Sequence, residues 1–252
     1  MVLKFRASRW ASHWRRIGAG LVLMGVLGAP GGAVAKKVEV DRAIIESGKS
    51  VAVLFHCARV VISRNQDLIN DAGKGDKGLT ADAVIRQTKE IYKELIGADL
   101  SIGKDQQTLL DAIRAVMDEN QATINTPGTA FKGFVPATFG RQVADKVAAT
   151  TSIEIRQTNS RVRSRKNRAD EWEKTVLGMV PKTISDGPPK VFRESTSERG
   201  KVTHRFLVPE YYEASCLACH GGSKGERDIT GAKMEGRGVG DLGGAISVIY
   251  KG

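Results

Sequence analysis

The sequence predicts an α+β fold, with helices in the first half of the chain and an antiparallel sheet in the second. Between residues 38 and 150, apolar residues recur at three- and four-residue spacing, which is typical of helices with one buried face. Between residues 151 and 252 the period falls to two, and short apolar runs alternate with Gly-containing turns. Because strands joined by short turns pair in opposite directions, we expect an antiparallel sheet packed against the helices.

We expect four main helices before residue 151. The first is predicted from about Val40 to Asn70, and a Gly-rich loop follows it. Thr80 or Asp82 can cap the second helix, and Pro136 suits the first turn of the fourth. The buried face of the first helix is expected to carry Ile44, Val51, Leu54, Ala58, Val61 and Ile62.

Four strands and one short helix are expected in the second half. The strands are placed near residues 153–155, 191–193, 202–208 and 245–250, and residues 198–200 read as a turn. Asp170–Glu173 opens the short helix with acidic residues in its first turn. In the third strand, His204 and Phe206 share one face with Val202 and Val208.

The first 35 residues have the features of a secretory signal peptide. Five basic residues and no acidic one precede an apolar stretch from Ile17 to Ala29, and Ala33–Ala35 offers the small residues that a signal peptidase accepts. The stretch is shorter than the roughly 20 residues of a membrane span, so an uncleaved anchor is the weaker interpretation. We therefore expect residues 36–252 to be one exported, periplasmic domain without stable membrane insertion.

The charge of the chain does not indicate a nucleic-acid partner. The net charge is +11, and it falls to +6 without the leader. A basic run at residues 161–168 could resemble a phosphate-binding patch. An exported protein rarely meets nucleic acid, and such a run is ordinarily a solvated loop, so we exclude nucleic-acid binding.

The sequence Cys216-Leu217-Ala218-Cys219-His220 is the attachment motif of haem c. Two thiols on one helical turn can each add to a haem vinyl group, and the adjacent imidazole then coordinates the iron. A disulfide, a thioredoxin-like redox site and a structural zinc site are the alternatives. Zinc needs four ligands, thioredoxin-like sites need no adjacent histidine, and export leads to a compartment where haem c is made, so we predict one covalent haem c.

The second axial ligand has several candidates in the sequence. Cys57 is the odd cysteine, lies on the apolar stripe of the first helix and would lower the haem potential as a thiolate. The same position also suits a small core residue. His204 is the weaker alternative, since a lone inward-facing histidine is more often a core residue. The other candidates are His56, Met179 and Met234, and an iron without a second protein ligand is the last alternative.

The sequence resembles a family of single-haem, c-type sensor-like domains with a PAS-like fold, which occur alone or ahead of histidine kinases and cyclases. The stretches that carry the resemblance are Arg59–Asp71, Gly75–Thr80, Lys132–Phe139, Arg165–Glu173, Cys216–Gly221 and Gly240–Val248. The resemblance implies a haem between the helices and a PAS-like sheet, and it supports a cysteine ligand on the first helix. Arg163 and Arg165 are the residues we expect at a haem propionate, although Ser164 and Ala169 depart from the family's pattern in this loop.

Three classes of function fit these predictions. The first is a haem-based redox or gas sensor that signals to a separate partner protein, because a labile thiolate ligand can be displaced or lost on reduction. The second is a periplasmic electron carrier. The third, a peroxidase-like enzyme, is the weakest, because three histidines follow the leader and the sequence shows no distal acid and base. We expect no enzymatic activity.

Overall fold

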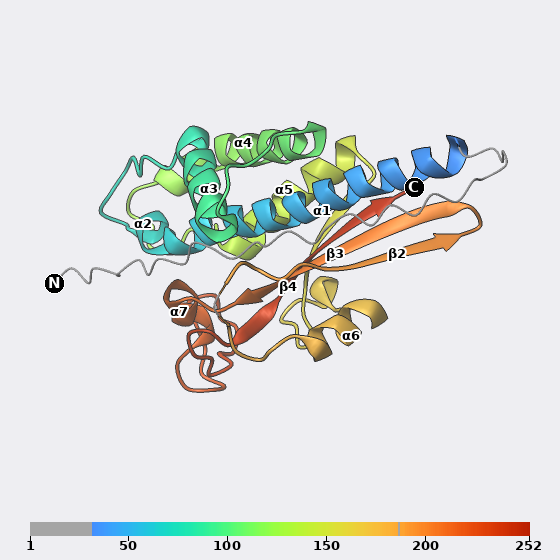
Figure 1. The fold of residues 1–252 in the computed structure, drawn as a ribbon. Helices are drawn as coiled ribbons and strands as arrows, with labels where there is room; N and C mark the ends of the chain where they lie inside the picture. The colour runs from blue at the N-terminus through green and yellow to red at the C-terminus, as the bar shows by residue number, and fades with distance from the viewer. Residues whose placement is uncertain (1–31, 186) are drawn as a thin grey trace, which may run out of the picture.

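The computed structural model describes residues 32–185 and 187–252, with side chains from residue 42 onward (Figure 1). Most of the predicted signal peptide lies outside these residues. In the described part of the chain, no helix combines the length and the apolar character needed to cross a bilayer.

Five helices form one layer of the molecule. They are α1 (Gly32–Arg64), α2 (Gln66–Asn70), α3 (Ala81–Ile96), α4 (Lys104–Asn125) and α5 (Pro136–Thr150). The first predicted helix is divided in two at Asn65, whose backbone leaves the helical region at φ −98° and ψ 12°. The predicted starts of α3 and α5 are confirmed. Thr80 caps α3 by accepting from the Ala83 amide, and Pro136 begins α5.

Four antiparallel strands form the sheet, in the order β1-β4-β3-β2. They are β1 (Ile153–Thr158), β2 (Phe192–Glu198), β3 (Lys201–Tyr211) and β4 (Leu242–Lys251). The predicted α+β fold is therefore confirmed. Arg199 and Gly200 close the β2–β3 hairpin with φ of 50° and 80°, as a two-residue turn with the twist of the strands requires.

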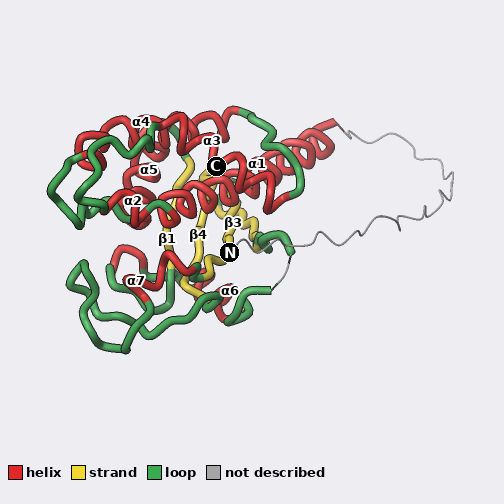
Figure 2. The backbone as a smooth tube through the Cα atoms, turned by 90° about the vertical axis from the view of Figure 1, so that its left-hand side faces the viewer, coloured by secondary structure: helices red, strands yellow, loops and turns green. Residues whose placement is uncertain are grey.

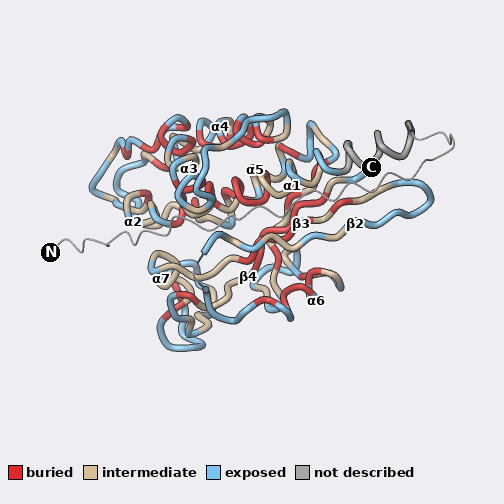
Figure 3. Tube along the Cα trace, in the orientation of Figure 1, coloured by how far each residue is buried: buried red, intermediate tan, exposed pale blue. Residues whose placement is uncertain are grey.

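The two faces of the sheet are covered unequally. The five helices pack on one face, and their large apolar core includes Phe206 and Val208 of β3 (Figures 2 and 3). On the other face, α6 (Glu171–Met179) packs against Leu207 and Ala245 in a small separate cluster. As predicted, acidic residues open α6, and Asp170 caps it by accepting from the Glu173 amide.

A glycine lets α1 approach the sheet closely. A Cβ atom on Gly48 would come within 2.1 Å of the Phe206 ring. This close contact fixes α1 over β3 and β4, so the next turns of the helix, from His56 to Ser63, come to face the chain that follows β3. That chain contains the 3₁₀ turn η2 (Ala214–Cys216) and α7 (Leu217–His220), which lie on the far side of the sheet from α4 (Figure 1).

Candidate haem-binding cavity

A cavity of about 440 Å³ lies where α1, the start of α5 and the end of β1 meet the segment that follows β3. Its volume is in the range of small-molecule and cofactor sites. Cys216, Cys219 and His220 line one wall, and His56, Arg59, Val60 and Ser63 of α1 line another. The structure thus places the predicted attachment motif in a cavity, as a cofactor site requires.

The attachment motif is held next to α1. Cys216 ends η2, and Cys219 and His220 lie on the single turn of α7. Both cysteines are half-buried free thiols, so the structure contains no disulfide between them. The Ser63 hydroxyl lies 2.9 Å from the Ser215 hydroxyl and 3.5 Å from the Cys216 sulfur, which ties the motif to the helix.

His220 is oriented by a carboxylate. Its Nδ1 lies 2.8 Å from Glu235 Oε2, and the Tyr212 ring packs against the imidazole at 4.8 Å between centroids. Burial lowers the pKa of His220, and this effect outweighs the hydrogen bond to Glu235, which raises the pKa. The lowered pKa favours the neutral imidazole, the form that binds metals. With Nδ1 donating to Glu235, Nε2 is the nitrogen left available to a metal, an arrangement common among metal-binding histidines.

Arg163 contacts three groups of this wall. Its guanidinium donates to Glu235 Oε1 at 2.6 Å, to Asp228 Oδ2 at 2.6 Å and to the Cys219 carbonyl at 2.7 Å. These contacts engage most of its donors and give Arg163 a positioning role, and because Arg163 also lines the cavity, its propionate contact stays a prediction. Arg165, in contrast, is exposed on the 3₁₀ turn η1 (Arg165–Asn167) and does not line the cavity, so the structure does not support its propionate contact.

A second histidine lines the cavity from α1. His56 Nδ1 lies 3.2 Å from Glu210 Oε1, and Arg59 donates to Glu210 Oε2 at 2.7 Å. Burial opposes ionisation of Glu210, but the charge of Arg59 and the hydrogen bond from His56 outweigh it and hold the pKa of this carboxyl below its usual range. The Nε of Arg59 is buried and has no hydrogen-bond partner within the described part of the chain.

Comparison with known proteins identifies the family to which this chain belongs. The Tll0287-like family model matches residues 86–250, which include α7 and all of the sheet except Lys251, the last residue of β4. The chain belongs to the Tll0287-like family. This membership confirms the resemblance seen in the motifs.

One solved structure resembles the chain, that of the cyanobacterial haem protein Tll0287. It is 21% identical, with a TM-score of 0.38, and the match covers 59% of this chain and 95% of that one. No curated protein matches the sequence.

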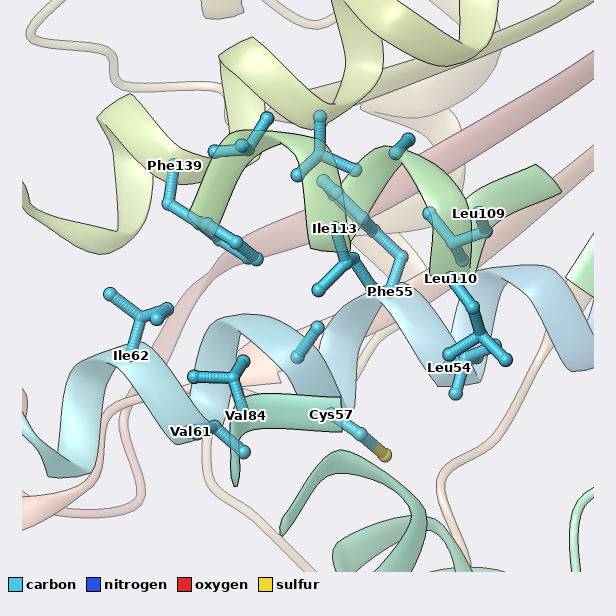
Figure 4. Packing of buried hydrophobic residues seen from close by; sticks show 14 of the residues in the cluster. Leu54, Phe55, Cys57, Val61, Ile62, Val84, Leu109, Leu110, Ile113 and Phe139 are labelled. Carbon is cyan, nitrogen blue, oxygen red and sulfur yellow. The ribbon is translucent and has the colours of Figure 1, made fainter. Parts of the chain in front are cut away.

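Cys57 does not reach the cavity. Its side chain is fully buried in the core of the helical layer, among residues such as Leu54, Val61 and Val84 (Figure 4). Burial raises the pKa of the thiol to about 12, so the thiol is neutral in this core. The structure thus places Cys57, one candidate for the second axial ligand, outside the cavity: it is turned about 100° around the helix from His56, the residue that faces the cavity.

His204 also lies outside the cavity. It is buried on β3, and its Nδ1 lies 2.8 Å from the Ser195 hydroxyl of β2. Six residues separate it from Glu210, about 20 Å along an extended strand. Of the two methionine candidates, Met179 is exposed at the end of α6 and Met234 packs against Gly222, and neither lines the cavity.

The sequence analysis named His56 as a candidate ligand, but it missed most of the other polar residues that shape the cavity. Residues 56, 59, 60 and 63 follow the helical spacing of one face, and this pattern on a different side of α1 from Cys57 could have shown them. Glu210 and Glu235 carried no such signal, because they lie on different segments that only the fold brings together.

Proposed function

We propose that the protein is a c-type haem protein that attaches one haem through Cys216 and Cys219 and binds its iron through His220. The observation that supports this most strongly is that both thiols and the Glu235-oriented imidazole line one cavity. The unpaired Nε of Arg59 fits the same interpretation, since a buried donor without a partner can donate to a carboxylate such as a haem propionate. Haem c supplies one-electron chemistry at its iron when bound.

The chain's own residues have three tasks in this proposal. Cys216 and Cys219 hold the cofactor covalently, and Glu235 keeps the proton on His220 Nδ1 so that Nε2 faces the iron. Arg163 donates to both Glu235 and the Cys219 carbonyl, so one side chain positions the attachment cysteine and the partner of His220.

Attachment can be tested by expressing the full chain with a haem c maturation system. We expect the wild type to keep its haem on a denaturing gel, and Cys216→Ala/Cys219→Ala to lose it. Cys57→Ala is the matched control and should keep the haem. Loss of haem from the denatured wild type would refute covalent attachment.

Electron transfer is the function that the cavity supports best. The sensor hypothesis rested on the PAS-like fold and on a thiolate from Cys57 that could be displaced, and Cys57 is instead a neutral thiol in the core. A carrier keeps both axial ligands on reduction, so ferric and ferrous spectra should both be six-coordinate and unaffected by carbon monoxide.

Redox or gas sensing is the second candidate, and α1 is the observation that favours it. This one helix runs for 33 residues from Gly32 to the cavity wall, so a change at the cavity could be passed along it to a partner protein. A ligand lost on reduction, or a spectral shift with carbon monoxide, would favour sensing over electron transfer.

Export to the periplasm belongs to the same proposal, because haem c is attached outside the cytoplasm. Residues 1–35 provide the signal, with Lys36 as the expected first residue of the mature chain. Mass spectrometry of the periplasmic protein should give that terminus, whereas an intact Met1 in the membrane fraction would show an uncleaved anchor.

A further inference from the structure

Two Arg–Glu–His chains line the same cavity. On the attachment wall, Arg163 donates to Glu235, and Glu235 lies 2.8 Å from His220 Nδ1. On the α1 wall, Arg59 donates to Glu210, and Glu210 lies 3.2 Å from His56 Nδ1. The two sets come from unrelated segments, yet each histidine is held through the same ring nitrogen by a carboxylate that an arginine holds in turn.

This arrangement prepares a histidine to bind a metal. A carboxylate on Nδ1 fixes the proton there, so Nε2 keeps its lone pair and the ring cannot turn. A histidine with a purely structural role needs no free Nε2 facing a cavity. The His56 side chain is 15% exposed, and His56 lines the cavity, as His220 does.

The position of His56 along α1 is compatible with the face of the haem opposite His220. Ser63 touches Cys216, so this end of the helix marks the attachment edge of the cavity. His56 lies seven residues earlier, two turns and about 10 Å along the same face. Val60 lies between them and also lines the cavity, which leaves an apolar surface between the attachment point and His56.

We propose that His56 is the second axial ligand of the haem, opposite His220, with Glu210 and Arg59 as its positioning residues. The inference rests on the proposed function, since it needs a haem held by Cys216 and Cys219. It replaces the sequence candidates that the fold places elsewhere, Cys57 in the core and His204 on a distant part of β3.

The test uses the full holoprotein and compares His56→Ala with Cys57→Ala, its neighbour on the same helix. Absorption and electron paramagnetic resonance spectra of the ferric form report the ligands directly. We expect a low-spin, bis-imidazole signature in the wild type and in Cys57→Ala. His56→Ala should become high-spin and should bind carbon monoxide when reduced.

Two controls accompany the His56→Ala variant. Added imidazole should restore the low-spin spectrum, and circular dichroism and an unfolding midpoint equal to those of Cys57→Ala would show that the variant is folded. His56→Met is a second variant, and it should give a low-spin spectrum with a sulfur-ligand signature in place of the second imidazole.

The outcomes separate this inference from the proposal on which it rests. A wild type without covalent haem on a denaturing gel overturns both. A wild type with covalent haem, whose low-spin spectrum is unchanged in His56→Ala, overturns the role of His56 alone. A change in Cys57→Ala instead of His56→Ala would return the ligand to Cys57.

Discussion

The two walls of the cavity are built by different forces. The α1 wall is one side of a helix whose other side is buried in the largest apolar core of the described chain, with Phe55 fully enclosed. The attachment wall, from residue 213 to 241, has one turn of α-helix and is held by hydrogen bonds and ion pairs around Arg163 and Asp228. Apolar burial is insensitive to a single lost polar contact, whereas a polar network depends on each of its members.

This difference has a consequence for the order in which the walls form. The α1 wall folds with the core and does not need a cofactor. In the attachment wall, two thioether bonds would add a covalent constraint to a segment with little apolar core of its own. Bound haem should therefore reduce the loss of stability caused by a substitution in the attachment wall, but not the loss caused by a substitution behind the α1 wall.

Phe55→Ala should have the largest effect on stability, because it removes a buried ring from the core behind α1. We expect a loss of about 4 kcal/mol in the free energy of unfolding, in the apoprotein and the holoprotein alike. Denaturant titration of both forms measures this. A loss confined to one form would contradict the independence of the α1 wall from the haem.

Arg163→Ala should destabilise the attachment wall by about 3 kcal/mol in the apoprotein, because it leaves the buried Asp228 carboxylate without its cation. Covalent haem should reduce the loss, and hydrogen exchange should rise at residues 213–241 and not in α4. Arg165→Ala is the matched control, since Arg165 is exposed on the same loop and outside the cavity. Equal effects of the two substitutions would refute the positioning role of Arg163.

Glu235→Gln and Glu210→Gln should each raise the midpoint potential of the haem. A neutral partner makes the imidazole less electron-donating, which weakens the ferric state more than the ferrous state. Each tenfold loss of that preference is about 59 mV in a one-electron couple. Potentiometry measures both shifts, with Glu213→Gln as a control. A shift from Glu235→Gln alone would show that the α1 wall supplies no ligand.

The smallest effect is expected at Cys57, on the sealed side of α1. Because burial raises the pKa of the thiol to about 12, native holoprotein should show almost no reaction with a thiol reagent at pH 8, and denatured holoprotein should show one reactive thiol. The neutral thiol favours the folded state. The stability that it contributes is fully present below about pH 9, the pKa of an exposed thiol, and is lost as the pH rises toward about 12. Three reactive thiols after denaturation would mean that Cys216 and Cys219 are free.

Local physical signals in the sequence determined much of the fold. The change of period at about residue 150 marks where α5 ends and β1 begins, and Pro136, Thr80 and Asp170 mark helix starts, because caps and proline act within one turn. The attachment motif is equally local: its residues are neighbours in the chain, and the structure adds only the cavity around them.

Which wall each polar side chain faces was decided by the tertiary structure. Cys57 and His56 are adjacent in the sequence, and only the packing of α1 on the sheet and on α3 turns one into the core and the other toward the cavity. Glu210 and Glu235 meet their histidines across 154 and 15 residues, and no local pattern encodes such contacts. The sequence by itself therefore determined the elements and the proposed attachment site, and the burial of α1 decided which residues can complete it.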